Sequence, residues 1–465
     1  MEPERDADPL RLLGRAAAAL NLDNLPPEVL QRAKQRVLDA LGCLVAGYEG
    51  HVAETIRSYV LAQGGNAEAT LLPGGEKTTA ALAGFAHATC IYGLELSDCA
   101  PRGTVHPGCK VVPIALAVAE RGRLGGAAVL PALVAGYEVE IRFARTVHPH
   151  AWYRGWKPLG IFGAIGPAVA AGHIMGLDAD GLDNAIGIAL NLAPMATGRT
   201  NQIGSAKWLF GGQACTSGLL AAEMSGHGFK GMRDVVGGWL NLVSEQNHPE
   251  RLTEGIDAQA QFTQWELLSG VVTKYHATIG PLVSPIEAVF SLLQQYDIRP
   301  EDVVEIHADC PHRTAVFNKP HPENEVTARA SLPYCLAVAV CTRDPGQLLG
   351  AAYKPDALRN ETVRALAEKV RVTANDEYER QYPARSLARV TIRLRNGLAH
   401  SLEVDRSALG RYLAPTDADI EQKFRLLATP VLGRDRADTV VGLVGNLESL
   451  SDLGELLAAL RVSST

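Results

Sequence analysis

Apolar residues recur at helical spacing through the first part of the chain, up to about residue 265. Pro26 and Pro27 mark the start of a helix that continues through VLQRAKQRVLDALGCLVAG. Further helices are predicted over Ala80 to Tyr92, Val111 to Glu120, Ala127 to Val147 and Gly181 to Leu192. Several of these are apolar nearly all round, which is typical of helices inside a large helical domain. Strand patterns are scarce here, so we predict an all-helical domain.

The pattern changes after about residue 300. Val303 to Ala308 alternates as a strand would, with Val303, Glu305 and His307 on one face. Two later runs flank Asn396-Gly397, a dipeptide typical of a two-residue hairpin turn. These two predicted strands are Ala388 to Leu394 and Leu398 to Val404. Helices are predicted over Ala330 to Cys341, Glu361 to Lys369, Asp417 to Leu427 and Glu448 to Leu460.

This order of elements predicts a mostly α protein with two domains. We place a large all-helical domain at residues 1–268, completed by C-terminal helices over 405–465, and a smaller α+β domain at 269–404. Pro158 to Leu177 carries no charge over about the thickness of a membrane. Because this stretch contains Pro167 and is rich in Gly and Ala, we interpret it as a buried helix rather than a membrane span.

The composition narrows the classes of partner. The formal net charge is -7 and the pI is near 6.0, which disfavours nucleic acid because its partners carry a basic surface. Neither a run of like charges nor a basic, apolar leader points to a membrane or to secretion. The eight cysteines show no CxxC spacing, so we expect buried thiols and a cytoplasmic protein.

The sequence lacks the motifs that bind common metals and organic cofactors. No GxGxxG follows a predicted strand, and no HExxH occurs. There is no GxSxG nucleophile elbow either. We therefore expect chemistry carried by side chains, with no metal and no cofactor.

Polar residues gather in a loop between two apolar helices, within GLELSDCAPRGTVHPGCKVVP at residues 93–113. Loops held by rigid helices are frequent sites of chemistry. The candidates in this loop are Glu95, Asp98, Arg102 and His106, and those in four later polar clusters are Lys157, Arg199, Lys207, Trp208, Lys274, His276 and Tyr334. Each also has a structural interpretation, such as a helix cap or a core aromatic. The combination of unlike ionisable groups beside apolar helices favours a catalytic site.

These segments resemble motifs of the MmgE/PrpD family along essentially the whole chain. The matching stretches are VLDALGCLVAGYEG at 37–50, LELSD followed by VHPGCKVVP, GWKPLGIFGAIGPAVAAG, GSAKWLFGGQA, ARASLPYCLAVAV and EQKFRLL. The resemblance implies a large helical domain and a smaller α+β domain, usually in a homodimer, with the active site between the domains. It also implies that Asp98, His106, Lys207 and Tyr334 line that site, and that Glu95 stands where many members have Asp.

The sequence departs from the family pattern at three histidine positions. Lys157 replaces the histidine of the family's HPT element, and Trp208 with Phe210 occupies the stretch where the lysine motif usually continues with a histidine. A third histidine position reads Ile279 or Val283, although His276 lies nearby. We therefore expect a more apolar site than is usual in the family.

The resemblance implies proton transfer next to a carboxylate of a small di- or tricarboxylate substrate. We predict His106 as the general acid and base, oriented by Asp98 or Glu95, because the pKa of histidine lies near neutrality. Lys207 and Lys274 are expected to hold substrate carboxylates, and Tyr334 to donate a hydrogen bond or a proton. The further substrate-binding candidates are Arg102, Arg199, His276 and Trp208. Lys157 has two interpretations, a carboxylate clamp or an amine base or nucleophile.

Three functions remain open from the sequence. The first is a lyase, either a dehydratase or a decarboxylase, and the second is an isomerase or epimerase that uses the same proton chemistry. The third is a binding homologue without catalysis. The joint presence of His106, Lys207 and Tyr334 argues against this third interpretation.

Overall fold

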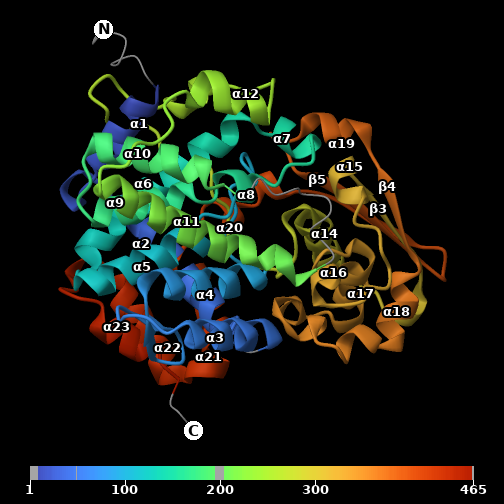
Figure 1. Ribbon diagram of the computed structural model, residues 1–465. Helices are drawn as coiled ribbons and strands as arrows, with labels where there is room; N and C mark the ends of the chain where they lie inside the picture. Colours follow the sequence, from blue (N-terminus) through green and yellow to red (C-terminus); the bar gives the residue numbers. More distant parts are fainter. Residues whose placement is uncertain (1–8, 49, 194–203, 463–465) are drawn as a thin grey trace. The chain divides into compact units, whose positions relative to one another are not determined.

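The computed structural model describes residues 9–48, 50–193 and 204–462, and these divide into two compact units (Figure 1). The helical unit contains the described residues up to 193 together with 205–273 and 414–462. The α+β unit contains residues 274–413. The predicted fold class, mostly α with a large helical part and a smaller α+β part, is confirmed.

Long helices account for most of the helical unit. α6 is innermost, because every residue from Val129 to Thr146 is buried, and α5 and α9 pack against it. The C-terminal helix α21 lies along α2, so the end of the chain completes the unit (Figure 1). The longer helices are α1 Pro9–Ala18, α2 Pro27–Ala46, α3 His51–Gln63, α4 Ala80–Gly93, α5 Gly108–Gly122, α6 Gly126–Thr146, α9 Ile165–Ile174, α10 Ala179–Asn191, α11 Leu209–Gly226, α21 Asp417–Leu432 and α22 Arg434–Gly445.

Two features of the helical unit differ from the sequence prediction. The charge-free stretch after Lys157 forms two helices, α8 Pro158–Phe162 and α9, rather than one. Pro167 has no N–H to donate to the carbonyl of Gly163 four residues earlier, so a continuous helix is interrupted there. A two-stranded antiparallel ribbon, β1 Ala69–Leu71 with β2 Glu76–Thr78, also occurs in the part predicted to be all-helical. Strands of three residues are too short for alternation to reveal them.

None of the helices in the described residues is sufficiently long and apolar to cross a membrane. The stretch at 158–177 is buried in protein along most of its length.

The α+β unit is built on a four-stranded sheet with the order β4-β3-β5-β6. β3 pairs in parallel with β4 and antiparallel with β5, and the β5–β6 hairpin turns at Asn396-Gly397 as predicted. Gly397 has a positive φ of 86°, which suits glycine in such a turn. Helices α14 and α17 pack against the strands. The bounds are β3 Val303–Cys310, β4 Val370–Ala374, β5 Leu387–Leu394, β6 Ala399–Asp405, α14 Val283–Gln295, α17 Leu332–Thr342 and α18 Glu361–Ala367.

Two features of the α+β unit differ from the sequence prediction: strand β4 was not predicted, and Val303 lies on the opposite face of its strand. β4 does alternate, as Val-Arg-Val-Thr, but it spans only five residues directly after the helix predicted to end at Lys369, and so short a run is a weak signal of a strand. The register of β3 shifts between Val303 and Glu305, and this bulge turns Val303 inward. Val303 is therefore buried, while Glu305 and His307 lie on the partly exposed face.

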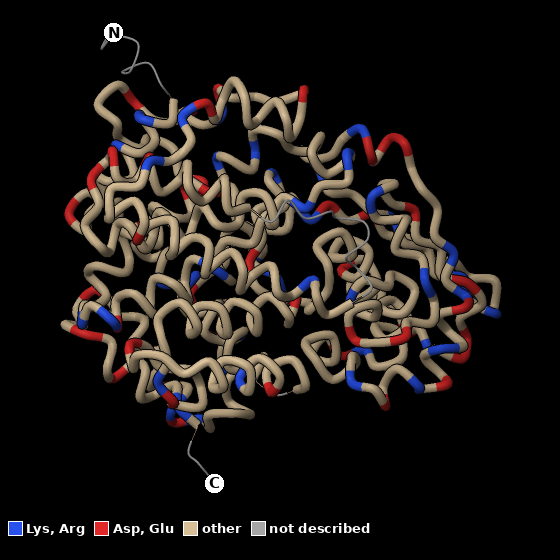
Figure 2. The backbone as a smooth tube through the Cα atoms, viewed as in Figure 1, with Lys and Arg blue, Asp and Glu red and all other residues tan. Residues whose placement is uncertain are grey.

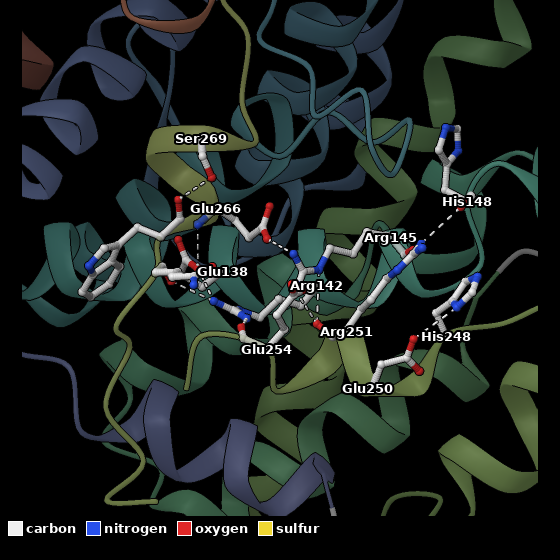
Figure 3. Close-up of polar contacts among 12 residues, drawn as sticks. Glu138, Arg142, Arg145, His148, His248, Glu250, Arg251, Glu254, Glu266 and Ser269 are labelled. Carbon is white, nitrogen blue, oxygen red and sulfur yellow. Dashed lines mark hydrogen bonds and ion pairs between the residues drawn. The ribbon is translucent and has the colours of Figure 1, made fainter. Parts of the chain in front are cut away.

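Acidic and basic residues are interspersed along the outer turns and helices of both units (Figure 2). Several charges nevertheless lie inside the helical unit, on α6 (Figure 3). Glu138 accepts hydrogen bonds from the main-chain N–H groups of Glu266 and Leu267 at 3.0 and 2.9 Å. Arg142 donates to Glu138 at 3.3 Å and to the carbonyl of Gln264 at 2.9 Å. These contacts fix an irregular segment, because a buried charge requires a partner.

Arg145, one turn further along α6, holds the beginning of the same segment (Figure 3). Its guanidinium pairs with Glu266 and, at 2.8 Å, with Glu254. It also donates to the carbonyl of Arg251 at 2.6 Å, and Arg251 donates back to the carbonyl of Arg145 at 2.9 Å. Residues 251–267 are thus held by ion pairs and hydrogen bonds to the charged side chains of α6, because little of this segment lies in regular helices or strands.

We predict that Glu138→Ala destabilises the helical unit by about 3–5 kcal/mol, since it removes the carboxylate that pairs with Arg142 and leaves two main-chain N–H groups without their acceptor. The five tryptophans at 152, 156, 208, 239 and 265 all belong to the helical unit, so tryptophan fluorescence during urea unfolding reports on it. The largely exposed Arg425–Asp438 pair of the same unit provides the control, because Asp438→Asn should change the stability by less than about 1 kcal/mol. Equal effects of the two substitutions would contradict the prediction.

Candidate functional site

The candidate site centres on the acid loop, residues 94–107, between the end of α4 and the start of α5. Cys99 and Val272 exchange main-chain hydrogen bonds of 3.0 and 2.8 Å, which tie the loop to the segment held by α6. Lys423 of α21 donates to the carbonyl of Leu96 at 3.0 Å and pairs with Asp39 of α2. The loop is therefore held by two elements, the strand-like contact with Val272 and the side chain of Lys423 on α21.

His106 is the histidine of this loop, and it is 7% exposed. Its Nδ1 lies 2.8 Å from the main-chain carbonyl oxygen of Asp98. A carbonyl accepts but never donates, so Nδ1 carries the proton and Nε2 is the nitrogen that takes up or releases one. The ring of Tyr92 packs beside the imidazole, with the centroids 5.5 Å apart. The geometry suits a general acid and base.

Asp98 fixes the backbone around His106. One carboxylate oxygen accepts from the N–H of Gly108 at 2.9 Å, and the other accepts from the hydroxyl of Tyr137 at 2.7 Å. The carboxylate thus closes the loop onto α5, while the main-chain carbonyl of the same residue orients the imidazole. Burial raises the pKa of Asp98, against the opposing effect of the nearby Arg36 guanidinium. The sequence predicts that Asp98 or Glu95 orients His106, and in the structure the contact comes from the main-chain carbonyl of Asp98.

Glu95 and Lys207 form a buried ion pair, with each side chain 5% exposed. Glu95 lies on the acid loop and Lys207 on the short helix η3, Ser205–Trp208, which leads into α11. The backbone of Glu95 has a φ of 55°, in the left-handed region that costs a non-glycine residue about 1–2 kcal/mol. The ion pair supplies a reason for a carboxylate to remain at this strained position.

Two buried polar atoms beside this pair have no hydrogen-bond partner among the described residues. They are the hydroxyl of Tyr92 and the indole Nε1 of Trp208. Trp208 packs against Gly93, where a Cβ would lie 3.5 Å from the indole ring. Burial, and then the charge of Glu95, raise the pKa of Tyr92 well above its ordinary value, so its hydroxyl stays a donor. A buried donor without an acceptor is costly, which makes these two groups candidates to bind an anionic ligand.

Two further residues of the site, Tyr92 and Tyr137, are not among the candidates that the sequence indicates. Both are buried hydroxyls that flank His106 or Asp98, yet each lies within an apolar helix pattern. A polar hydroxyl inside an otherwise apolar helix is the signal that was available. The sequence does not reveal which group such a hydroxyl meets, because Tyr137 lies 39 residues from its acceptor Asp98.

The other candidates of the helical unit are Lys157, Arg102 and Arg199. Lys157 is half-buried at the N-cap of α8, and Arg102 is exposed in the turn at 101–104. Arg199 lies outside the described residues. The structure thus brings together Glu95, Asp98, His106, Lys207 and Trp208 through the acid loop and η3, and the two interpretations of Lys157 stay open.

The remaining candidates belong to the α+β unit. Lys274 is buried at the start of this unit. His276 is also buried, and its Nε2 lies 2.7 Å from a carboxylate oxygen of Glu287. Tyr334 donates its hydroxyl to the carbonyl of Ala352, and burial raises its pKa. The Tyr334 hydroxyl is thus hydrogen-bonded within the fold, and both of its interpretations, a core aromatic and a donor to the substrate, stay open.

Glu287 and His276 form a carboxylate–histidine pair. Burial alone would raise the pKa of Glu287, but His276, Arg411 and Tyr412 lower it to about 2. The carboxylate therefore stays ionised and holds Nε2, while Nδ1 of His276 has no hydrogen-bond partner within the described residues. This is the arrangement in which a carboxylate orients a histidine for proton transfer. The sequence indicates His276 as a candidate site residue but gives no sign of Glu287.

A cavity of about 10 Å³ lies elsewhere in the helical unit, lined by residues that include Leu72, His87 and Glu120. It has room for one water molecule at most. The candidate site is therefore defined by its side-chain chemistry and not by this cavity.

Models of known protein families match most of the chain. The MmgE/PrpD N-terminal domain matches residues 11–252, and the MmgE/PrpD C-terminal domain matches residues 276–448. The cis-aconitate decarboxylase of Aspergillus terreus (strain NIH 2624 / FGSC A1156) is 25% identical over 470 residues, with 96% of this chain and 94% of the relative covered. The cis-aconitate decarboxylase of Homo sapiens is 24% identical, with 96% and 93% covered. Because the two domain models together span far more than half of its residues, the chain belongs to the MmgE/PrpD family.

Proposed function

We propose that this protein is a lyase that decarboxylates a small unsaturated tricarboxylate of the cis-aconitate type. The end-to-end similarity to relatives named cis-aconitate decarboxylase supports the reaction class. The observation that carries the proposal is the buried His106, whose Nδ1 is fixed by the Asp98 carbonyl so that Nε2 exchanges the proton. Both the relatives and the residues therefore point to proton-coupled loss of a carboxylate.

The reaction needs one proton and no oxidant. In an acid of this type a CH₂–COO⁻ arm is attached to a carbon–carbon double bond. The bond to the departing carboxylate breaks, and its electron pair forms a new double bond to the CH₂ carbon. The electrons of the old double bond then take up a proton at its far carbon, and carbon dioxide leaves. Negative charge builds on the carbon skeleton along this path, so nearby cations and hydrogen-bond donors lower the barrier.

The residues of the acid loop supply these requirements. Protonated His106 delivers the proton from Nε2. Lys207 pairs with a substrate carboxylate, and Glu95 keeps its ammonium in place between turnovers. The Tyr92 hydroxyl and the Trp208 N–H donate to the remaining carboxylate oxygens, which gives both groups the acceptor they lack among the described residues. Trp208 also excludes water, which strengthens these electrostatic contacts.

Further roles rest on the family resemblance. We propose Lys274, Arg102 and Arg199 as additional carboxylate contacts. The paired His276 is proposed as a second proton-transfer group, supported by its bond to the ionised Glu287. Lys157 is proposed as a carboxylate clamp, with the amine base or nucleophile as the alternative.

Cellular location and assembly also remain proposals. We place the protein in the cytoplasm and expect a homodimer, as the resemblance implies. Light scattering of the purified chain would measure its mass in solution, and a monomeric mass at working concentrations would contradict the dimer.

We predict that the purified protein converts cis-aconitate to a product lighter by carbon dioxide, and that in deuterated water the product gains one deuterium on carbon. Mass spectrometry measures both changes. Deuterium uptake without loss of mass would instead indicate an isomerase or epimerase, and loss of water a dehydratase. A panel of other di- and tricarboxylates extends the test to the substrate.

We predict that His106→Ala lowers kcat by about a hundred- to ten-thousand-fold, because it removes the proton donor. The exposed His227 at the end of α11 provides a matched control, and His227→Ala should keep the wild-type kcat. Near-normal turnover in His106→Ala would remove His106 from the mechanism.

We predict that Lys207→Met raises KM about ten- to a hundred-fold, since a hydrogen bond to a charged group is lost. Lys207→Arg should recover part of this loss, because the cation remains. Steady-state kinetics with the accepted acid measures the effect. An unchanged KM in Lys207→Met would show that the lysine does not bind the substrate.

A further inference from the structure

The loop that bears His106 is also held by a buried charge that the proposed mechanism does not use. Lys110 is the third residue of α5 and is 0% exposed. Its ammonium reaches back four residues and donates to the main-chain carbonyl of His106 at 2.7 Å. The thiol of Cys109 donates to the same oxygen at 3.1 Å. The backbone of His106 is therefore fixed by two donors from the first turn of α5.

Lys110 is itself held by a partner from a different helix. Glu140 of α6 accepts from the Lys110 ammonium at 2.8 Å, and the side chains of both residues are 0% exposed. Burial favours the neutral amine, yet the attraction of Glu140 raises the pKa of Lys110 above its ordinary value. Lys110 therefore remains a cation and a strong donor.

The surrounding helices are shaped to accommodate this pair. A Cβ on Gly163 would lie 3.3 Å from Cε of Lys110. A Cβ on Gly166 would lie 2.4 Å from a carboxylate oxygen of Glu140, closer than packing allows. The thiol of Cys215 on α11 also donates to the main-chain carbonyl of Lys110 at 3.2 Å. Contacts from several helices thus converge on the pair.

We propose that the Lys110–Glu140 pair positions the catalytic imidazole, by clamping the carbonyl of His106 to α6. Packing alone does not require such a pair, because apolar residues of similar volume often replace a buried ion pair without loss of stability. An apolar pair cannot donate to the His106 carbonyl, however. With Asp98 fixing the ring and Lys110 fixing the main chain, both halves of His106 are held. This inference rests on the proposed role of His106.

The double variant Lys110→Met with Glu140→Met separates the two roles of the pair. We expect Lys110→Met alone to lower the urea midpoint of tryptophan fluorescence, since it leaves Glu140 buried without its cation. The double variant should regain a midpoint close to wild type. Its kcat should nevertheless stay about ten- to a hundred-fold below wild type with KM within about twofold, because a displaced base slows the chemical step. Wild-type kcat in a stable double variant would overturn the proposal.

A second comparison remains decisive if the double variant fails to fold. The amide of Glu140→Gln still accepts from Lys110, whereas the side chain of Glu140→Leu does not. We expect kcat to be higher in Glu140→Gln than in Glu140→Leu, and equal values would overturn the proposal. The matched control is Lys34→Met with Glu448→Met, which removes another ion pair of the helical unit and should leave kcat unchanged.

A readout without substrate distinguishes this inference from the proposed function. The ring proton on Nδ1 of His106 should give a slowly exchanging NMR signal in the wild type, identified by its absence in His106→Ala. The signal should exchange faster in the double variant, and an unchanged exchange rate would count against positioning. Absence of turnover in the wild type would instead defeat the proposed function, and full turnover in His106→Ala would remove the catalytic role of His106, whatever the signal shows.

Discussion

Charges buried away from water set the arrangement of the helical unit. Glu138, Glu140, Arg142 and Arg145 lie on α6, within a stretch of buried residues. A charge in such a place is tolerated when another group pairs with it, so each one fixes the segment that carries its partner. The residues near 251–267 have little regular secondary structure, and they are held by these contacts instead. One helix thereby determines the path of chain far from it in sequence.

The same contacts reach the candidate site. The segment held by α6 continues to Val272, which pairs with Cys99 in the acid loop. Glu140 of α6 meets Lys110, which holds the carbonyl of His106. The imidazole is therefore placed largely through main-chain atoms, and its geometry depends on residues that need not touch a substrate. In the proposed mechanism, side chains that face the substrate can therefore be substituted while His106 keeps its position.

Family membership and the departures from the family pattern bear on different properties. In the proposed function, the histidine of the acid loop and the Glu95–Lys207 pair supply a proton donor and a cation, which suit removal of a carboxylate. Beside these residues, the indole N–H of Trp208 and the hydroxyl of Tyr92 are hydrogen-bond donors carried by large, buried aromatic side chains. In that proposal the first group of residues carries the reaction, whereas the second group determines which acid fits.

The sequence by itself determined the fold class, most helices and the acid loop, because these depend on local periodicity and on residues adjacent in the chain. It also identified Glu95, Asp98, His106 and Lys207 as candidates. It predicts one helix where Pro167 makes two, and it does not reveal β4, because a five-residue strand directly after a helix gives too short an alternating run. Only the tertiary structure decided that Tyr137 meets Asp98, that Glu140 meets Lys110 and that Glu287 holds His276. Such pairings join distant residues through packing, and no local pattern in the chain encodes which buried partner each one meets.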